Sequence, residues 1–412
     1  MFSSLSKERV RGKKERRWRL FHATDFQSLM YPCFILCRIL GIFPYKINTS
    51  SFEISKPCYI LSTVIKCVTC FYTLIILYEI NSGLFKVRSL RRIIEVSAFY
   101  VFGIFIIIVT CIWDGPRMRL LQTLLKISSG LPLESYQKPS ILIHAKDISG
   151  FLFLLVQTMI CFNLLPVLHV VFTFHITLIV FQMDMLYMNC VCVLKICFKK
   201  INDDLENLLV LINEPHLFRR FYHEQRNPFF LMELKAIEKR HLMANNTLQM
   251  LNIIFSLQLS ATVVITFTRI TFSLYYCLQL VLWPNVHITS SEKLISLTLF
   301  FTSIAYYFIK IALIVWTCET GKDQAIEIGI TIHNVLNRIN DEQIKNELHL
   351  FSLQILHTSK NTFSAKGFTM DAPLLATLIG SITTYLLILI QFANISNSCN
   401  EQFKFSNITQ TT

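Results

Sequence analysis

Seven long apolar stretches restrict what this chain can fold into. Each holds about 20 mostly apolar residues, the length of helix that crosses the roughly 30 Å hydrocarbon core of a bilayer. They cover residues 58–78, 94–113, 148–168, 170–194, 251–282, 296–317 and 373–392. This pattern predicts an all-α polytopic membrane protein with seven transmembrane helices. Pro166 separates the third and fourth stretches at a tight hairpin, and the fifth is long enough to project beyond the bilayer.

Composition excludes the main soluble classes. Hydrophobic residues make up 53% of the 412 residues and charged residues only 16%, too few to cover the surface of a soluble enzyme. The 13 cysteines show no zinc-binding spacing and mostly lie in apolar segments, so neither a disulfide framework nor a metal site is predicted. No nucleotide, metalloprotease or nucleophile motif is present. We therefore expect no enzyme, no catalytic residue and no cofactor.

An earlier apolar stretch, residues 29–43, is too short for a span. It begins near Pro32 and carries Arg38, which favours an interfacial or re-entrant helix. The stretch starts late for a signal peptide and is followed by no clear cleavage site, so we expect the N terminus to be retained.

Lysine and arginine distribution sets the expected orientation. With the N terminus in the cytoplasm, cytoplasmic segments hold 30 of these residues and external segments 6, within a net charge of +13. The loop 80–93 is an exception, with four of the six. Sequons at Asn394 and Asn407 agree with an external C terminus, since such acceptors are used on the lumenal side. The prediction is a cytoplasmic N terminus and an external C terminus.

The expected organisation follows from these spans. Residues 1–57 form a basic cytoplasmic tail and interfacial helix, in which Lys7–Arg19 lies against anionic lipid rather than nucleic acid. The segments 197–249 and 318–372 have mixed charge with apolar residues at helical spacing, typical of cytoplasmic helices. The remaining segments are helices 1–4 (58–196), helices 5–6 (250–317), a last helix (373–393) and an external tail (394–412).

The last span carries the most specific motif. Thr384 and Tyr385 are followed by five apolar residues and then by Gln391 and Phe392. Seven residues are nearly two helical turns, so Thr384 lies above Gln391, and Tyr385 above Phe392, with Ile388 in the same stripe. Such polar groups in hydrocarbon need a partner or water. The stripe is therefore either hydrogen-bonding contact within a bundle or the wall of a water-filled path.

This motif, together with Gly380-Ser381-Ile382-Thr383 before it, resembles the signature of the insect gustatory receptors. Chain length, seven spans, inverted topology and a long segment before the last helix fit the same family. The resemblance implies a taste receptor acting as a tastant-gated, non-selective cation channel in the plasma membrane of chemosensory neurons. It implies a homo- or heterotetramer with gustatory receptor subunits, surrounded by membrane lipid and binding no nucleic acid.

The resemblance also assigns expected pore residues. The seventh helices of four subunits surround one pore that is narrowest at Gln391 and Phe392, with Thr384, Tyr385 and Ile388 along its wall. Phenylalanine rings close such a pore by excluding water. Sugar-responsive members of the family commonly carry a glutamate where this chain has Leu386, so a receptor outside the main sugar clade is expected.

Three cations lie inside predicted spans. Arg269, in the outer part of the fifth span, is a candidate ligand contact; the alternatives are a buried carbonyl or carboxylate partner, or a side chain that reaches the interface. Lys310 is expected to pair or to reach the cytoplasmic interface, and Lys66 is equally well placed to face lipid.

Polar and aromatic residues in the outer halves of the fifth and sixth spans complete the candidate pocket. With Arg269 they are Thr266, Tyr275, Tyr276, Thr302, Tyr306 and Tyr307. Tyrosine is also enriched at membrane interfaces for purely structural reasons. The alternative function, a secondary transporter of a small polar solute, is less favoured because no internal repeat is present.

Overall fold

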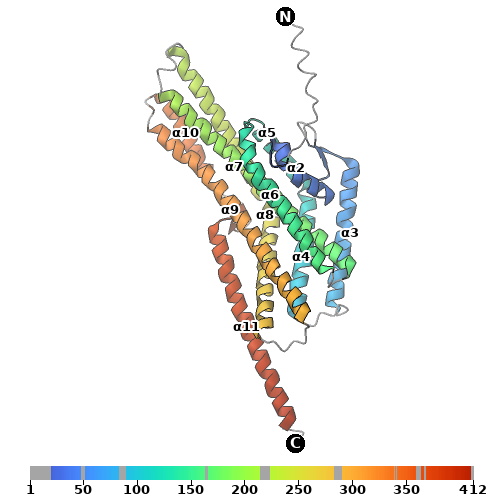
Figure 1. Ribbon diagram of the computed structural model, residues 1–412. Helices are drawn as coiled ribbons and strands as arrows, with labels where there is room; N and C mark the ends of the chain where they lie inside the picture. The colour runs from blue at the N-terminus through green and yellow to red at the C-terminus, as the bar shows by residue number, and fades with distance from the viewer. Residues whose placement is uncertain are drawn as a thin grey trace.

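The computed structural model describes residues 20–47, 52–82, 90–162, 166–213, 223–282, 290–337, 339, 341–358, 363–365 and 368–409. Within these residues, seven helices are long and apolar enough to cross a membrane, which confirms the predicted fold class (Figure 1). They are α3 (Lys56–Asn81), α4 (Leu90–Ile112), α6 (Glu134–Cys161), α7 (Val167–Asn213), α8 (His223–Leu282), α9 (Ser290–Leu336) and α11 (Ala372–Thr409).

The predicted helix boundaries around Pro166 differ from the structure. The third apolar stretch covers 148–168, but α6 begins at Glu134 and ends at Cys161. Hydropathy misses its polar first part, which forms helix all the same because one face is buried, including Tyr136 and Ile143. Helix α7 then starts at Val167, directly after Pro166. A proline disfavours the helical conformation of the residue that precedes it.

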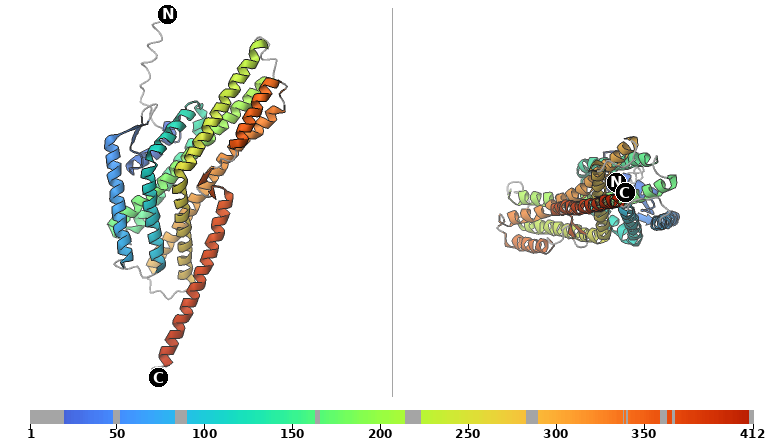
Figure 2. Two further views of the ribbon diagram at one scale, coloured as in Figure 1. Left: turned by 180° about the vertical axis from the view of Figure 1, so that it is seen from behind. Right: turned by 90° about the horizontal axis from the view of Figure 1, so that it is seen from below.

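Helix α7 is the centre of the bundle. In its most apolar stretch 94% of the residues are buried, against 6% for α11. Close approach to α7 needs small residues on its neighbours: a Cβ atom on Gly103 of α4 would lie 2.6 Å from Ile176, and one on Gly150 of α6 would lie 2.6 Å from Phe181. Helix α11 instead lies on the outside, against α8 and α9 (Figure 2).

The short helix α2 (Phe26–Ile39) inserts one face into the bundle. Its 14 residues are about 21 Å long, too short to span a bilayer. Asp25 caps it, accepting a hydrogen bond from the Ser28 backbone. The side of the helix that packs on α6 and α7 is buried, whereas Tyr31, Ile35 and Ile39 are exposed. The sequence predicts a short apolar helix here, which the structure shows, while its interfacial or re-entrant position in the membrane stays a prediction.

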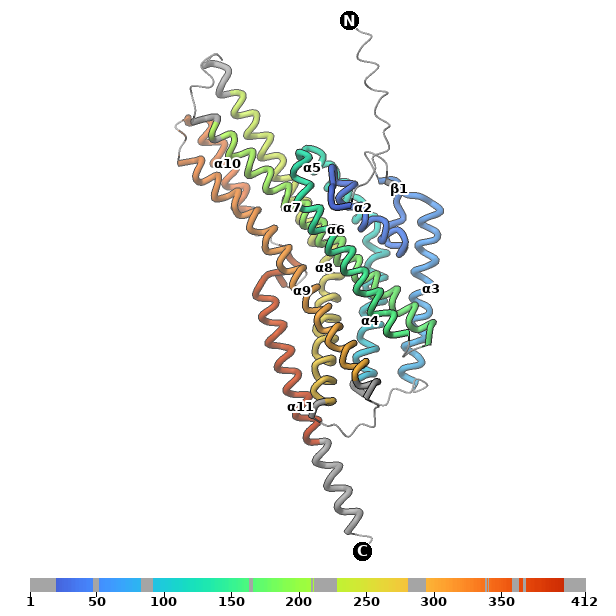
Figure 3. Tube along the Cα trace, viewed as in Figure 1, coloured from blue at the N-terminus to red at the C-terminus, as the bar shows by residue number. Residues whose placement is uncertain are grey.

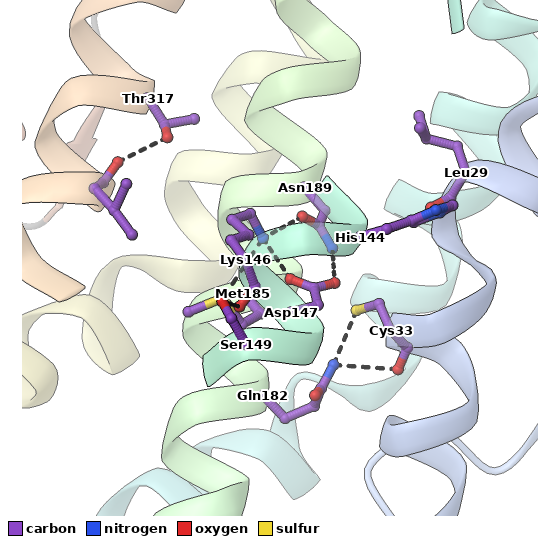
Figure 4. Close-up of polar contacts among 11 residues, drawn as sticks. Leu29, Cys33, His144, Lys146, Asp147, Ser149, Gln182, Met185, Asn189 and Thr317 are labelled. Carbon is purple, nitrogen blue, oxygen red and sulfur yellow. Dashed lines mark hydrogen bonds and ion pairs between the residues drawn. The ribbon is translucent and has the colours of Figure 1, made fainter. Parts of the chain in front are cut away.

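Polar side chains bind α2 and α6 to α7 (Figure 4). His144 accepts at Nδ1 from the Phe21 backbone and contacts the Leu29 carbonyl through Nε2 at 3.0 Å. Gln182 donates to the Cys33 carbonyl at 3.1 Å. These bonds satisfy backbone groups at the start of the chain's described part, so His144 has a structural role.

Lys146 and Asp147 of α6 meet Asn189 of α7 in a closed polar cluster (Figure 4). Lys146 donates to Asp147 at 2.5 Å and to Asn189 at 2.6 Å, and the Asn189 amide donates to Asp147 at 2.9 Å. Each member satisfies the other two, as buried charge requires. Sequence alone does not indicate this pairing, because Asn189 lies 42 residues further along the chain than Asp147.

A second buried charged residue, Arg117, lies just after α4 and holds the neighbouring segments together. Arg117, on helix α5 (Asp114–Ser128), is completely buried and binds Asp114 at 2.5 Å. Its guanidinium also donates to the carbonyls of Ile42 and Thr110. The adjacent hairpin pairs β1 (Tyr45–Ile47) with β2 (Phe52–Ile54), and the Tyr45 hydroxyl donates to the Asp114 carbonyl at 2.8 Å.

The long helices continue well beyond one bilayer thickness. Helices α7, α8 and α9 have 47, 60 and 47 residues. Beside them, away from α3 and α4, packs α10 (Glu342–Thr358), as Figure 3 shows. A two-stranded hairpin, β3 (Ser364–Ala365) with β4 (Phe368–Thr369), then leads into α11. We call the end of the bundle where α3 passes to α4 the α3–α4 end.

Candidate functional site

A cavity of about 330 Å³ lies near the α3–α4 end, between five helices. It is lined by the first turns of α4, the last turns of α6 and the first part of α7, and residues of α8 and α9 complete its wall. Its lining combines aromatic rings with many hydroxyl, amide and charged groups, so it suits a small molecule that has both polar and apolar parts.

An ion pair crosses this cavity. Nη1 of Arg269 on α8 lies 3.1 Å from Oε1 of Glu95 on α4, and the guanidinium lies 4.4 Å from the centroid of the Phe99 ring. Its Nε is buried and has no hydrogen-bond partner among the described residues. Glu95 holds Arg269 in place while one donor stays unused, so the pair is both a structural contact and a possible ligand contact.

Aromatic side chains form the wall contributed by α9. Tyr306 stacks on Phe153 of α6 at 5.8 Å between centroids, and Tyr276 of α8 lies 4.3 Å from Phe300. Polar contacts tie the other helices: the hydroxyls of Tyr100 and Thr173 are 2.7 Å apart, and Gln157 donates to Ser303 at 3.3 Å. The cavity therefore offers flat apolar surfaces with hydroxyl and amide groups at their edges.

The structure brings part of the predicted pocket together. Arg269, Tyr276, Tyr306 and Tyr307 line the cavity, whereas Thr266, Tyr275 and Thr302 are absent from its wall. Neighbouring residues on a helix point about 100° apart, so Tyr276 faces the cavity and Tyr275 does not. The same holds for Ser303 and Thr302, whose hydroxyl donates to its own helix at Thr298.

Sequence reasoning missed the cavity residues of α4, α6 and α7. Glu95 was detectable, because it is an acid inside a predicted span, and only cations had been considered there. Tyr100, Gln157 and Thr173 carried no distinguishing signal, since their position depends on how the helices pack.

A buried charged cluster lies directly behind the cavity wall. Nζ of Lys310 is 2.9 Å from Oδ2 of Asp184, whose other oxygen accepts from Gln258 at 2.5 Å and from Thr262 at 2.9 Å. The same Nζ lies 5.2 Å from the Tyr307 ring centroid. Of the two expectations for Lys310, the structure shows pairing. Lys66 is only 6% exposed, so the lipid-facing position, one of the alternatives for it, is not the one that the structure shows.

Helix α11 presents the Thr384–Phe392 motif on a largely uncovered surface. Phe392 is 68% exposed, Tyr385 54% and Ile388 38%, and Gln391 is exposed with no hydrogen-bond partner among the described residues. The Thr384 hydroxyl donates a hydrogen bond to the Gly380 carbonyl of its own helix at 2.9 Å. Tyr385 alone of these makes a ring contact within the described part, at 5.5 Å from Phe267 of α8.

Comparison with known families agrees with this architecture. Residues 30–394 match the family model described as 7tm Chemosensory receptor. The chain belongs to this family. The resemblance predicted from the last span is thereby confirmed, and because the family consists of receptors, so is the non-enzymatic interpretation.

Two relatives of this chemosensory receptor come from Drosophila melanogaster. "Putative gustatory receptor 28b" is 32% identical over 149 residues, 36% of this chain and 31% of that protein. "Putative gustatory receptor 28a" is 28% identical over 161 residues, 39% of this chain and 35% of that protein. The matched stretch thus spans about a third of each relative.

Solved structures of similar shape include those of an insect olfactory receptor. The receptor OR5 from Machilis hrabei superimposes with a TM-score of 0.68 and 13% identity, covering 89% of this chain and 98% of OR5. OR5 in complex with eugenol gives a TM-score of 0.60 and 14% identity, with the same coverage. At this identity the likeness shows that the chemosensory receptor shares their fold.

Proposed function

We propose that this receptor is a gustatory receptor acting as a ligand-gated, non-selective cation channel. It assembles as a homo- or heterotetramer with gustatory receptor subunits in the plasma membrane of chemosensory neurons. Its N terminus is cytoplasmic, and the α3–α4 end faces outward, where tastants arrive. A small molecule bound in the 330 Å³ cavity favours the open state by binding it more tightly than the closed state.

The observation that carries the channel is the uncovered face of α11. A transmembrane helix with 6% of its apolar stretch buried has few contacts within its own chain. Lipid suits its leucines, but Gln391 lacks a partner among the described residues and sits beside the exposed Phe392. Four copies arranged around an axis would put this face on a water-filled path. The Phe392 rings then form an apolar neck that excludes water, and Gln391 replaces part of an ion's hydration.

The cavity fits a small, partly aromatic ligand. Its volume is near the lower limit of ordinary ligand sites, and lining rings such as Tyr276 and Phe300 provide flat contact surface. The fold neighbour OR5 binds eugenol, a small aromatic molecule, which supports a ligand of similar size here. Leu386 in place of the glutamate common in sugar-responsive members favours ligands other than those of the main sugar clade.

A contact between α8 and α11 provides a route from ligand to gate. Phe267 lies two residues before Arg269 on α8, and its ring meets that of Tyr385 on α11. Movement of α8 around a bound ligand therefore acts on the pore helix at the first pair of the motif. Spatial proximity suggests this route, and a double-mutant cycle at Phe267 and Tyr385 tests it.

Electrical recording tests the proposal. The receptor is expressed in heterologous cells, its surface protein is quantified, and a broad tastant panel is applied. A channel gives ligand-dependent, stepwise single-channel currents carried by several cations. Saturable solute flux without current steps would identify the alternative, a secondary transporter, and would overturn the channel.

A further inference from the structure

A second cavity, of about 490 Å³, lies far from the first one along the bundle, between α6, α7 and α9. It is lined by four lysines, two carboxylates and an exposed tryptophan: Lys138, Lys195, Lys199, Lys200, Glu134, Asp203 and Trp316. None of these residues belongs to the ligand cavity or to the α11 motif. Positive charge exceeds negative charge in this cavity.

Most of its lysines are not neutralised by the fold. Lys200 pairs with Asp204 at 2.7 Å. Among the described residues, no ion pair joins Lys138, Lys195 or Lys199 to a carboxylate, and Nζ of Lys195 instead lies 5.7 Å from the Trp316 ring centroid. Ammonium groups gathered in a cavity repel one another unless an anion joins them. The cavity is therefore suited to a polyanion.

The second cavity lies at the level where α6 and α9 leave the hydrocarbon core of the membrane. The apolar part of α9 starts at Leu294, and Trp316 lies about 33 Å further along the helix, slightly more than one hydrocarbon thickness. Measured back from Cys161, the end of α6, Leu142 lies about 29 Å away. Both helices reach the membrane surface at this cavity, and tryptophan is the residue typical of that surface.

The rim next to the lysines is apolar. Leu142 and Trp316, 37% and 47% exposed, line the cavity, and Ile141 beside them is 56% exposed. A soluble phosphate compound would gain no contact from such an apolar rim, whereas the acyl chains of a lipid would pack against it. The ligand that fits is therefore a lipid with a phosphorylated headgroup, whose apolar chains continue into the bilayer.

We propose that this cavity binds the headgroup of a polyphosphorylated inositol lipid of the cytoplasmic leaflet. The phosphomonoesters contact Lys138, Lys195 and Lys199, and the acyl chains lie along α6 and α9 beside Leu142. Basic pockets between transmembrane helices on the cytoplasmic side recognise anionic headgroups in this way. The site spans three helices, so occupancy also ties α6 to α7 and α9.

Binding is measured on the full-length receptor in phosphatidylcholine nanodiscs that contain a trace of fluorescent phosphatidylinositol bisphosphate. The test variant is Lys138→Gln/Lys199→Gln, whose side chains are both exposed and therefore safe for folding. The matched control, Lys235→Gln/Lys239→Gln, removes two exposed lysines from α8, outside the cavity. Each lysine near an anionic headgroup contributes about fivefold in affinity, so the test variant should bind roughly 25-fold more weakly and the control nearly as well as the parent.

Three results would overturn the proposal. Equal weakening in both double variants would show general surface charge rather than a site. In the second result, phosphatidylserine displaces the labelled lipid as efficiently as unlabelled phosphatidylinositol bisphosphate does. That result would show that the site does not recognise the phosphomonoester groups. Binding of soluble inositol trisphosphate as tightly as the lipid would identify a free phosphate compound as the occupant. No current is recorded, so the outcome is independent of whether the receptor is a channel.

Discussion

The ring of Tyr385 meets the ring of Phe267 edge-on, at 5.5 Å between centroids and 79° between planes. Tyr385 belongs to the motif on α11, and Phe267 lies two residues from Arg269 in the ligand cavity. One aromatic contact thus joins the helix that carries the candidate ligand residue to the helix proposed to line the pore.

A double-mutant cycle tests whether this contact couples ligand binding to opening. Edge-to-face pairs contribute about 0.5–1.5 kcal/mol beyond the area they bury, so Phe267→Leu should raise the half-maximal agonist concentration about two- to tenfold. Tyr385→Leu should act in the same direction, and the double variant should add little to either. Concentration–response curves, normalised to surface protein, give the three values. Additive effects would mean that the two residues act separately.

The Lys310–Asp184 pair is expected to be essential for stability. Removing one partner of a buried ion pair leaves an uncompensated charge and typically costs about 3–5 kcal/mol. Lys310→Met should therefore lower the unfolding temperature of the purified receptor markedly. Lys310→Met/Asp184→Asn removes both charges and keeps an acceptor for Gln258 and Thr262, so it should recover most of the loss. A single variant as stable as the parent would contradict the buried pair.

Arg269 is expected to orient the ligand. Hydrogen bonds to charged groups contribute about 1.5–3 kcal/mol, so Arg269→Gln should weaken agonist potency by one to two orders of magnitude while single-channel conductance stays the same. Glu95→Gln is the control, because it removes the pairing charge but leaves the guanidinium in the cavity. Surface expression is measured in parallel. Lost expression in Arg269→Gln would assign Arg269 to structure alone, and unchanged potency with normal expression would remove it from the site.

Hydropathy was sufficient to predict the number of spanning helices, because length and apolarity alone decide whether a helix crosses a bilayer. It was insufficient for the cavity. Asp184 and Lys310 are 126 residues apart, and their pairing depends on how α7 and α9 are rotated about their axes. Tyr275 and Thr302 were assigned to the pocket because they lie at the right depth, but each points about 100° away from a neighbour that does line it.

The orientation of the receptor is a further prediction. An epitope added after Thr412 should be reached by antibody on intact cells, whereas one at Met1 should require permeabilisation. The reason is the excess of lysine and arginine, 30 against 6, in the segments assigned to the cytoplasm. The two epitopes serve as controls for each other. Labelling of Met1 on intact cells would reverse the whole assignment, including the outward position of the ligand cavity.

The most direct prediction concerns Phe392. If four Phe392 rings form the apolar neck of the pore, one substitution changes four lining positions together, and Phe392→Ala should let water and ions pass without ligand. Whole-cell current at rest, normalised to surface protein, measures this leak. Gln391→Ala should mainly change conductance or ion preference, because it removes a polar ring and leaves the neck in place.

Helix α11 also provides a matched pair of isoleucines to separate pore lining from packing. Ile388 lies in the stripe with Thr384 and Gln391, and Ile379, nine residues earlier, lies half a turn away on the opposite side of the helix. Both are exposed within the chain, at 38% and 52%. Ile388→Ala should therefore alter resting current or conductance, and Ile379→Ala should not. If Phe392→Ala is silent at rest and both isoleucine variants conduct like the parent, the stripe does not line the pore, and the motif is a packing surface between subunits.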